Sequence, residues 1–123
     1  MAQPKHILIV DDEADIRDIL SGALEMAGYR VSQADSAAAA KRLVADGPPD
    51  LIITDLQLEN SDGLELIAEI KLQHPQLPTL LLTGVLFDEK AIEDRLRKKV
   101  SGYLHKTAPL KTIRAEIVRL LGP

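Results

Sequence analysis

Three carboxylates at the ends of two apolar segments are the residues of this sequence best suited to chemistry. Asp11 and Asp12 end the run Ile7 to Val10, and Asp55 ends the run Leu51 to Thr54. Short apolar runs of this kind are typical of buried parallel strands, whose carboxyl ends open onto the ligand-binding edge of an α/β sheet. At about 4 Å and an effective dielectric of about 20, each like-charged pair repels by roughly 4 kcal/mol. The three acids therefore need compensating cations, and a hard divalent metal and a lysine are the candidates.

The size and composition of the chain exclude several classes of protein. Its 123 residues, 46% of them hydrophobic, suit one domain over residues 1–123. The absence of cysteine excludes disulfides and thiolate metal sites, and the apolar runs are too short to cross a bilayer. With no signal peptide in view, we expect a cytoplasmic protein without membrane association. A net charge of -4 argues against direct nucleic acid binding, since phosphate contacts need a basic face.

Strand-like and helix-like segments alternate along the whole chain, which predicts a parallel sheet with helices on both faces. The expected strands are residues 7–10, 30–34, 51–54, 79–83 and 101–105. Five helices are expected between and after them, with the second over residues 37–46 and a mostly charged fourth over about 88–99. The apolar face expected for the first helix consists of Ile16, Ile19, Leu20, Ala23, Leu24 and Ala27. Gly28 suits the C-terminal cap of that helix, Ser36 the start of the second, and Asp62-Gly63 the loop before the third.

The polarity of the strands indicates their order in the sheet. The first, third and fourth strands are continuously apolar, as central strands are, whereas residues 30–34 and 101–105 carry polar side chains suited to edges. With right-handed crossovers, the order 2-1-3-4-5 satisfies this pattern and puts a switch point between strands one and three. The expected fold is therefore a doubly wound, flavodoxin-like α/β domain with its acids beside that crevice.

The chain resembles a known family, the receiver domain of two-component response regulators. The motifs that carry the resemblance follow successive strands over essentially the whole chain: Asp11-Asp12, Asp55, Asp62-Gly63, Thr83-Gly84 and Tyr103-Leu104-His105-Lys106. The resemblance implies a phosphorylation-dependent signalling switch and not an enzyme with a separate substrate. It also implies a sensor histidine kinase or a histidine phosphotransfer protein as the phosphoryl donor.

The resemblance assigns a role to each matching acid. Asp55 is the implied phosphoryl acceptor and also contacts Mg²⁺. Asp12 is the implied direct Mg²⁺ ligand, Asp11 acts chiefly through water, and the backbone carbonyl of Gln57 completes the protein's share of the shell. Mg²⁺ prefers octahedral oxygen ligands and keeps several waters, which such a set allows.

The remaining motifs are implied to stabilise the transferred group and to transmit the signal. Lys106 and the Thr83 hydroxyl share the negative charge on the phosphoryl oxygens. Thr83 and Tyr103 are the implied switch residues, and they reshape a surface made by the fourth helix, fifth strand and fifth helix. A downstream effector, or a second copy of the domain, is expected to dock there.

One departure from the family pattern bears on the loop after the lysine. Many receivers have a proline joined by a cis peptide directly after the lysine, whereas this chain has Thr107. A cis bond without proline costs roughly 3 to 4 kcal/mol, so we expect the Lys106-Thr107 peptide to be trans.

Other interpretations of the same residues stay open. Asp11, Asp12 or Glu13 could simply cap the helix that follows them. The chain could be a pseudo-receiver, an interaction module that is not phosphorylated. It could also be a haloacid-dehalogenase-like phosphatase, although such enzymes place an Asp-x-Asp motif after the first strand, where this chain reads Asp-Asp-Glu-Ala-Asp from residue 11. It is expected to be either a free-standing regulator or a receiver cut from a longer chain.

Overall fold

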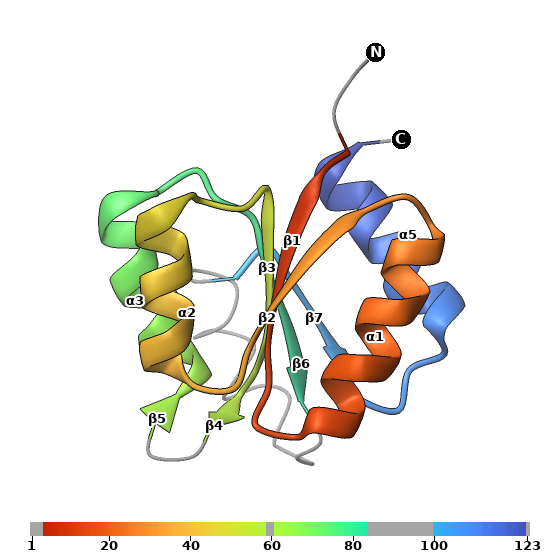
Figure 1. Cartoon of the computed structure of the whole chain (residues 1–123), viewed down its shortest axis with the longest axis horizontal. Helices are drawn as coiled ribbons and strands as arrows, with labels where there is room; N and C mark the ends of the chain where they lie inside the picture. The colour runs from red at the N-terminus through yellow and green to blue at the C-terminus, as the bar shows by residue number, and fades with distance from the viewer. Residues whose placement is uncertain (1–3, 59–60, 84–99, 123) are drawn as a thin grey trace.

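The computed structural model contains one five-stranded sheet with helices packed on both faces (Figure 1). It describes residues 4–58, 61–83 and 100–122. The strands of the sheet are β1 (His6–Val10), β2 (Arg30–Ala34), β3 (Leu51–Asp55), β6 (Thr79–Thr83) and β7 (Gly102–His105). All neighbouring strands are parallel, in the order β2-β1-β3-β6-β7. Since β6 and β7 are the fourth and fifth strands of this sheet, the predicted order 2-1-3-4-5 is confirmed.

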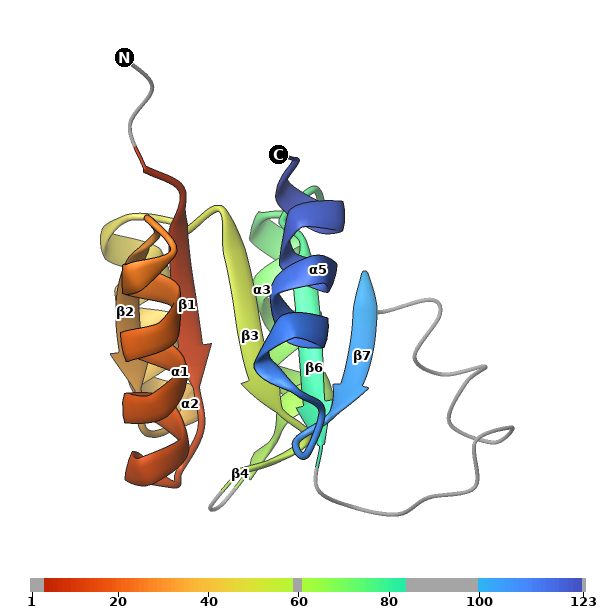
Figure 2. The same cartoon turned by 90° about the vertical axis from the view of Figure 1, so that its right-hand side faces the viewer.

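Four helices cover the sheet in the described part of the chain. They are α1 (Ala14–Met26), α2 (Ala37–Asp46), α3 (Gly63–Gln73) and α5 (Leu110–Leu121). Helices α1 and α5 lie on one face, in front of the sheet in Figure 2, and α2 and α3 lie on the other. The fourth helix predicted over about residues 88–99 falls outside the described residues.

Side chains that alternate between the two faces of the central strands divide the core into two layers. Ile7 and Ile9 of β1 pack into the layer under α1 and α5, while Leu8 and Val10 pack into the layer under α2 and α3. All four side chains are buried because helices cover both faces of the strand. Strands β2 and β7 are only partly buried, as the polarity of their sequences predicted for the edges of the sheet.

Helix termini follow the predicted capping signals. The Ser36 hydroxyl accepts a hydrogen bond from the Ala39 backbone N–H at 3.2 Å, and the Asp62 carboxylate accepts one from Leu64 N–H at 2.7 Å. Gly28, just after α1, has a φ of 100°, a left-handed conformation that glycine adopts without steric cost. The caps predicted at Ser36 and Gly28 are confirmed, whereas Asp62 was predicted only to lie in the loop before the third helix and turns out to cap it.

Ile19 does not belong to the buried face of α1, so its prediction was wrong. Its side chain is 60% exposed, whereas Leu20 and Leu24 are buried against the sheet. At about 100° per residue, Ile19 lies about a third of a turn from the line through Leu20 and Leu24. The buried stripe is therefore narrower than the apolar pattern indicated.

The segments after β3 and after β7 each have one further local feature. A short antiparallel pair, β4 (Gln57–Leu58) and β5 (Ser61–Asp62), follows β3 and was not predicted. Two-residue strands are too short to show the alternation by which strands are recognised. The Lys106-Thr107 peptide is trans, as predicted.

Candidate functional site

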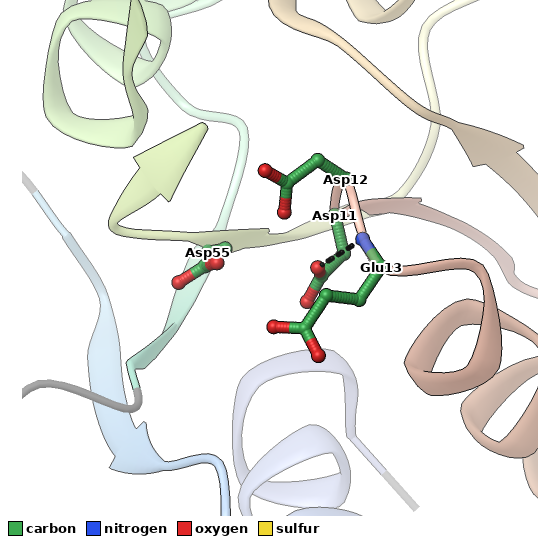
Figure 3. A group of neighbouring side chains, drawn as sticks. All are labelled: Asp11, Asp12, Glu13 and Asp55. Atoms are coloured by element: carbon green, nitrogen blue, oxygen red, sulfur yellow. Dashed lines mark hydrogen bonds between the residues drawn. The ribbon is translucent and has the colours of Figure 1, made fainter. Parts of the chain in front are cut away.

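The carboxyl ends of β1 and β3 bring four acidic side chains together. Asp11, Asp12 and Glu13 follow β1, and Asp55 is the last residue of β3, the neighbouring strand. One carboxylate oxygen from each of the four lies within 4.8 Å of the others (Figure 3). The predicted convergence of Asp11, Asp12 and Asp55 at one sheet edge is confirmed, with Glu13 as an additional member.

Asp11 is fixed through both its backbone and its side chain. Its N–H donates to the Ala34 carbonyl at 3.1 Å, which extends the pairing of β1 with β2. The Arg17 guanidinium of α1 donates to the Asp11 carbonyl. The Asp11 carboxylate accepts the Glu13 N–H at 2.9 Å, the dashed line in Figure 3. One Asp11 carboxylate oxygen thus accepts a backbone N–H at the start of α1, as a helix cap would. The other oxygen, Oδ2, faces Lys106 in the cluster.

The backbone around Asp55 is held by its neighbours. The buried Thr54 hydroxyl donates to the Asp55 carbonyl at 3.1 Å. The Gly63 N–H, at the start of α3, donates to the Leu56 carbonyl at 2.7 Å. A main-chain hydrogen bond therefore joins the residue after β3 to the first residue of α3. It holds the buried Asp55 in place at the edge of the sheet.

Lys106 places a positive charge against three of these four acids. It follows β7 in a turn closed by the Ala108 N–H, which donates to the His105 carbonyl at 2.9 Å. Its ammonium nitrogen lies 2.9 Å from Asp11 Oδ2, 2.9 Å from Asp55 Oδ2 and 3.1 Å from Glu13 Oε1. The lysine expected from the charge of the cluster is therefore present, and it bridges the ends of β1 and β3.

The environment shifts the pKa values of Asp11 and Lys106. Burial raises the pKa of the Asp11 carboxyl, and the hydrogen bonds from the Glu13 N–H and Lys106 only partly oppose that rise. Burial by itself lowers the pKa of Lys106, but the hydrogen bonds to Asp55, Asp11 and Glu13 outweigh it and raise that pKa above its ordinary value. Lys106 is therefore held in its charged form between the buried carboxylates of Asp11 and Asp55.

The other predicted site residues are placed only in part. Thr83 ends β6 beside His105, and its side chain is outside the described part of the structure. Gln57 begins β4, two residues beyond Asp55, and the role of its carbonyl stays a prediction. Tyr103 lies on the edge strand β7 and is 37% exposed.

Glu13 is a site residue that sequence reasoning treated only as a helix cap. It occupies the N-cap position of α1, yet its side chain makes no capping hydrogen bond. Its carboxylate instead pairs with Lys106. The available signal was its place in an unbroken run of three acids at a strand end, but nothing in that run shows which acids turn toward the lysine.

Comparison with known proteins identifies relatives over most of the chain. The response regulator receiver domain family matches residues 7–118. The phosphate regulon transcriptional regulatory protein PhoB of Pseudomonas aeruginosa is 42% identical over 82 residues, which is 65% of this chain and 36% of that protein. The nitrogen assimilation regulatory protein NtrX of Azorhizobium caulinodans is 44% identical over 80 residues, which is 63% of this chain and 18% of that protein. The chain thus spans about a third or less of the length of these relatives.

Solved structures agree with the sequence relatives. The receiver domain of NtrX from Brucella abortus is 33% identical, with a TM-score of 0.85 over 94% of this chain and 97% of that one. A chemotaxis protein of Vibrio cholerae is 28% identical, with a TM-score of 0.87 over 96% of this chain and 99% of that one. None of the helices in the described part of the chain is long and apolar enough to span a bilayer.

Proposed function

The chain belongs to the response regulator receiver domain family, the phosphorylation-dependent switches of two-component systems, and on that premise we propose that Asp55 is its phosphoryl acceptor. The observation that carries the proposal is the position of Lys106, whose ammonium lies 2.9 Å from Asp55 and 2.9 Å from Asp11. An acid at the end of a central strand, paired with a fixed lysine beside further acids, has the positioned charges that phosphoryl transfer needs.

The acidic cluster suits a Mg²⁺ ion. Asp11, Asp12 and Asp55 supply the hard oxygen donors that this ion prefers, and the carbonyl of Gln57 is the proposed fourth protein ligand. We assign direct contact to Asp12 and Asp55, and contact chiefly through water to Asp11. When bound, the ion supplies positive charge that stabilises the developing charge on the phosphoryl oxygens.

Each residue has a defined part in the transfer. An ionised Asp55 oxygen forms the bond to phosphorus while the bond from phosphorus to a histidine nitrogen of the donor breaks, and that nitrogen keeps the electron pair. No base is required, because the carboxylate is already a nucleophile. Lys106 remains beside the acceptor and attracts the transferred group, and the Thr83 hydroxyl is the proposed donor to a second phosphoryl oxygen.

The transferred group gives the domain its regulatory role. Asp55 gains roughly one further negative charge and new acceptor oxygens, and we propose that this draws in Thr83 and lets Tyr103 turn inward. The surface of the fourth helix, β7 and α5 would then meet an effector or a second copy. The donor is a sensor histidine kinase or a histidine phosphotransfer protein, and the domain assists only its own phosphorylation and dephosphorylation. The cytoplasm remains the proposed location, on the cysteine-free composition.

Intact mass measurement after incubation with a small acyl phosphate and Mg²⁺ tests the acceptor. The parent should gain one phosphoryl group and lose it with time, whereas Asp55→Asn should gain none. Asp46→Asn, an equal charge change at an exposed position of α2, serves as the control and should behave as the parent does. A parent that never gains mass would favour a pseudo-receiver, and steady turnover of the acyl phosphate would favour a phosphatase.

A further inference from the structure

Lys106 has more carboxylate partners than the proposed reaction needs. Asp11 and Asp55 both contact its ammonium, and both are also proposed contacts of a divalent cation. Metal binding therefore places two positive centres around the same two carboxylates. Because two cations that share carboxylates repel each other, the ammonium needs a partner that the metal does not draw on.

Glu13 has the position and the freedom to be that partner. Its carboxylate lies 3.1 Å from the Lys106 ammonium. The Glu13 side chain is 63% exposed, against 4% for Asp11 and 8% for Asp55, so it can adjust its position while they cannot. It is also released from helix capping, since Asp11 accepts the Glu13 N–H and the Glu13 side chain makes no capping hydrogen bond.

We propose that Glu13 is a positioning residue that keeps Lys106 in the site when a divalent cation is bound. It neutralises the ammonium from the solvent side, which lowers the repulsion between Lys106 and the metal. This inference rests on the proposed function, because it assumes that the acidic cluster holds Mg²⁺. In this role Glu13 affects metal binding through its ion pair with Lys106, and it is not itself a metal ligand.

Calorimetric titration of the chain with Mg²⁺ measures this role without any phosphoryl donor. Glu13→Gln should weaken Mg²⁺ binding about threefold, the scale of one partly exposed ion pair. Asp15→Asn is the matched control, since Asp15 is an exposed acid in the first turn of α1 outside the cluster. It should leave the affinity nearly unchanged. Equal effects of the two substitutions would overturn the proposal.

A double-mutant cycle separates action through Lys106 from direct ligation. In a Lys106→Met background, Glu13→Gln should have no more effect than Asp15→Asn, because the ammonium is gone. A loss of affinity that persists in that background would make Glu13 a metal ligand and overturn the proposal. If Lys106→Met does not fold, Lys106→Gln takes its place as the background without the ammonium. The same two outcomes then apply: no effect of Glu13→Gln beyond that of Asp15→Asn supports positioning, and a persisting loss of affinity contradicts it.

The same titration distinguishes failure of the Glu13 role from failure of the proposed function. If the parent chain binds no Mg²⁺, both the proposed Mg²⁺ site and the role of Glu13 are wrong. A parent that binds Mg²⁺ and is phosphorylated on Asp55, with Glu13→Gln indistinguishable from Asp15→Asn, would remove only the role of Glu13.

Discussion

Gly63 lies so close to Asp55 that a β-carbon at residue 63 would be 2.0 Å from the Asp55 carbonyl oxygen. The same β-carbon would lie 3.2 Å from the α-carbon of Leu56, so backbone atoms close off the space on that side. The start of α3 and the strand end that carries Asp55, the proposed acceptor, therefore touch through their main chains. Any side chain at residue 63 must push the acceptor and the helix apart.

Gly63→Ala should therefore destabilise the fold and displace the acceptor. We expect a loss of about 1 to 3 kcal/mol in the free energy of unfolding, the usual cost of overpacking, measured by urea denaturation. Phosphorylation by a small acyl phosphate should slow as well. Gly47→Ala is the control, because a β-carbon there meets nothing within 4 Å. Equal stability of the two variants would contradict the close approach of Gly63 to Asp55.

Mg²⁺ should raise the thermal midpoint of unfolding, because it binds the folded cluster and relieves repulsion among its acids. At about 100 times the dissociation constant, the gain is about 2.7 kcal/mol. Sodium chloride of matched ionic strength is the control for screening. Asp12→Asn should abolish most of the gain, since Asp12 is the proposed direct ligand. A midpoint that stays constant across millimolar Mg²⁺ would count against the site.

The ion pair between Glu116 and Arg119 should make stability depend on pH in the acid range. The hydrogen bond from Arg119 lowers the pKa of Glu116, against the opposing effect of burial. A carboxyl whose pKa is lowered by folding contributes stability that is present above its ordinary pKa and is lost as the pH falls through the lowered value.

Glu116→Gln should therefore be less stable than the parent near neutral pH, and the difference should disappear in strong acid. Urea denaturation at a series of pH values measures this difference. Glu25→Gln, at an exposed position of α1, is the control for loss of a surface charge. A stability difference that stayed constant down to the acid limit would show that the Glu116 carboxylate does not supply it.

A pair of substitutions on α1 tests which residues form its buried face. Leu24 is 1% exposed and Ile19 is 60% exposed. Leu24→Ala should cost about 2 to 5 kcal/mol, because it removes buried methyl groups and leaves a cavity under the helix. Ile19→Ala should cost less than about 1 kcal/mol. Similar losses from the two substitutions would mean that Ile19 packs in solution as its spacing predicted.

Features that depend on burial and strand ends were predictable from the sequence. The continuous apolar run of β1 indicated a central strand, and the polar residues of β2 and β7 indicated edges. Parallel strands end at the same edge, so the meeting of Asp11 with Asp55 followed from strand order alone. The cap at Ser36 was predictable because it depends on one side chain and a neighbouring N–H.

The features that escaped prediction depend on direction and on contacts between distant segments. Ile19 has the spacing of a buried residue, but its angle around α1 relative to the sheet is set by tertiary packing. The pairing of β4 with β5 involves too few residues to leave a pattern. The sequence around Glu13 indicates only a helix cap, because its partner Lys106 is 93 residues away and is brought beside it only by the fold.

That separation has a consequence for how the chain is made. Synthesis proceeds from the N-terminus, so Asp11, Asp12 and Glu13 emerge first, Asp55 about midway, and Lys106 close to the end of the segment that matches the family. A nascent chain therefore carries all four acids well before the lysine that pairs with three of them. An unfinished chain lacks the complete cluster, so the proposed phosphorylation site forms only once β7 and the turn after it have joined the sheet.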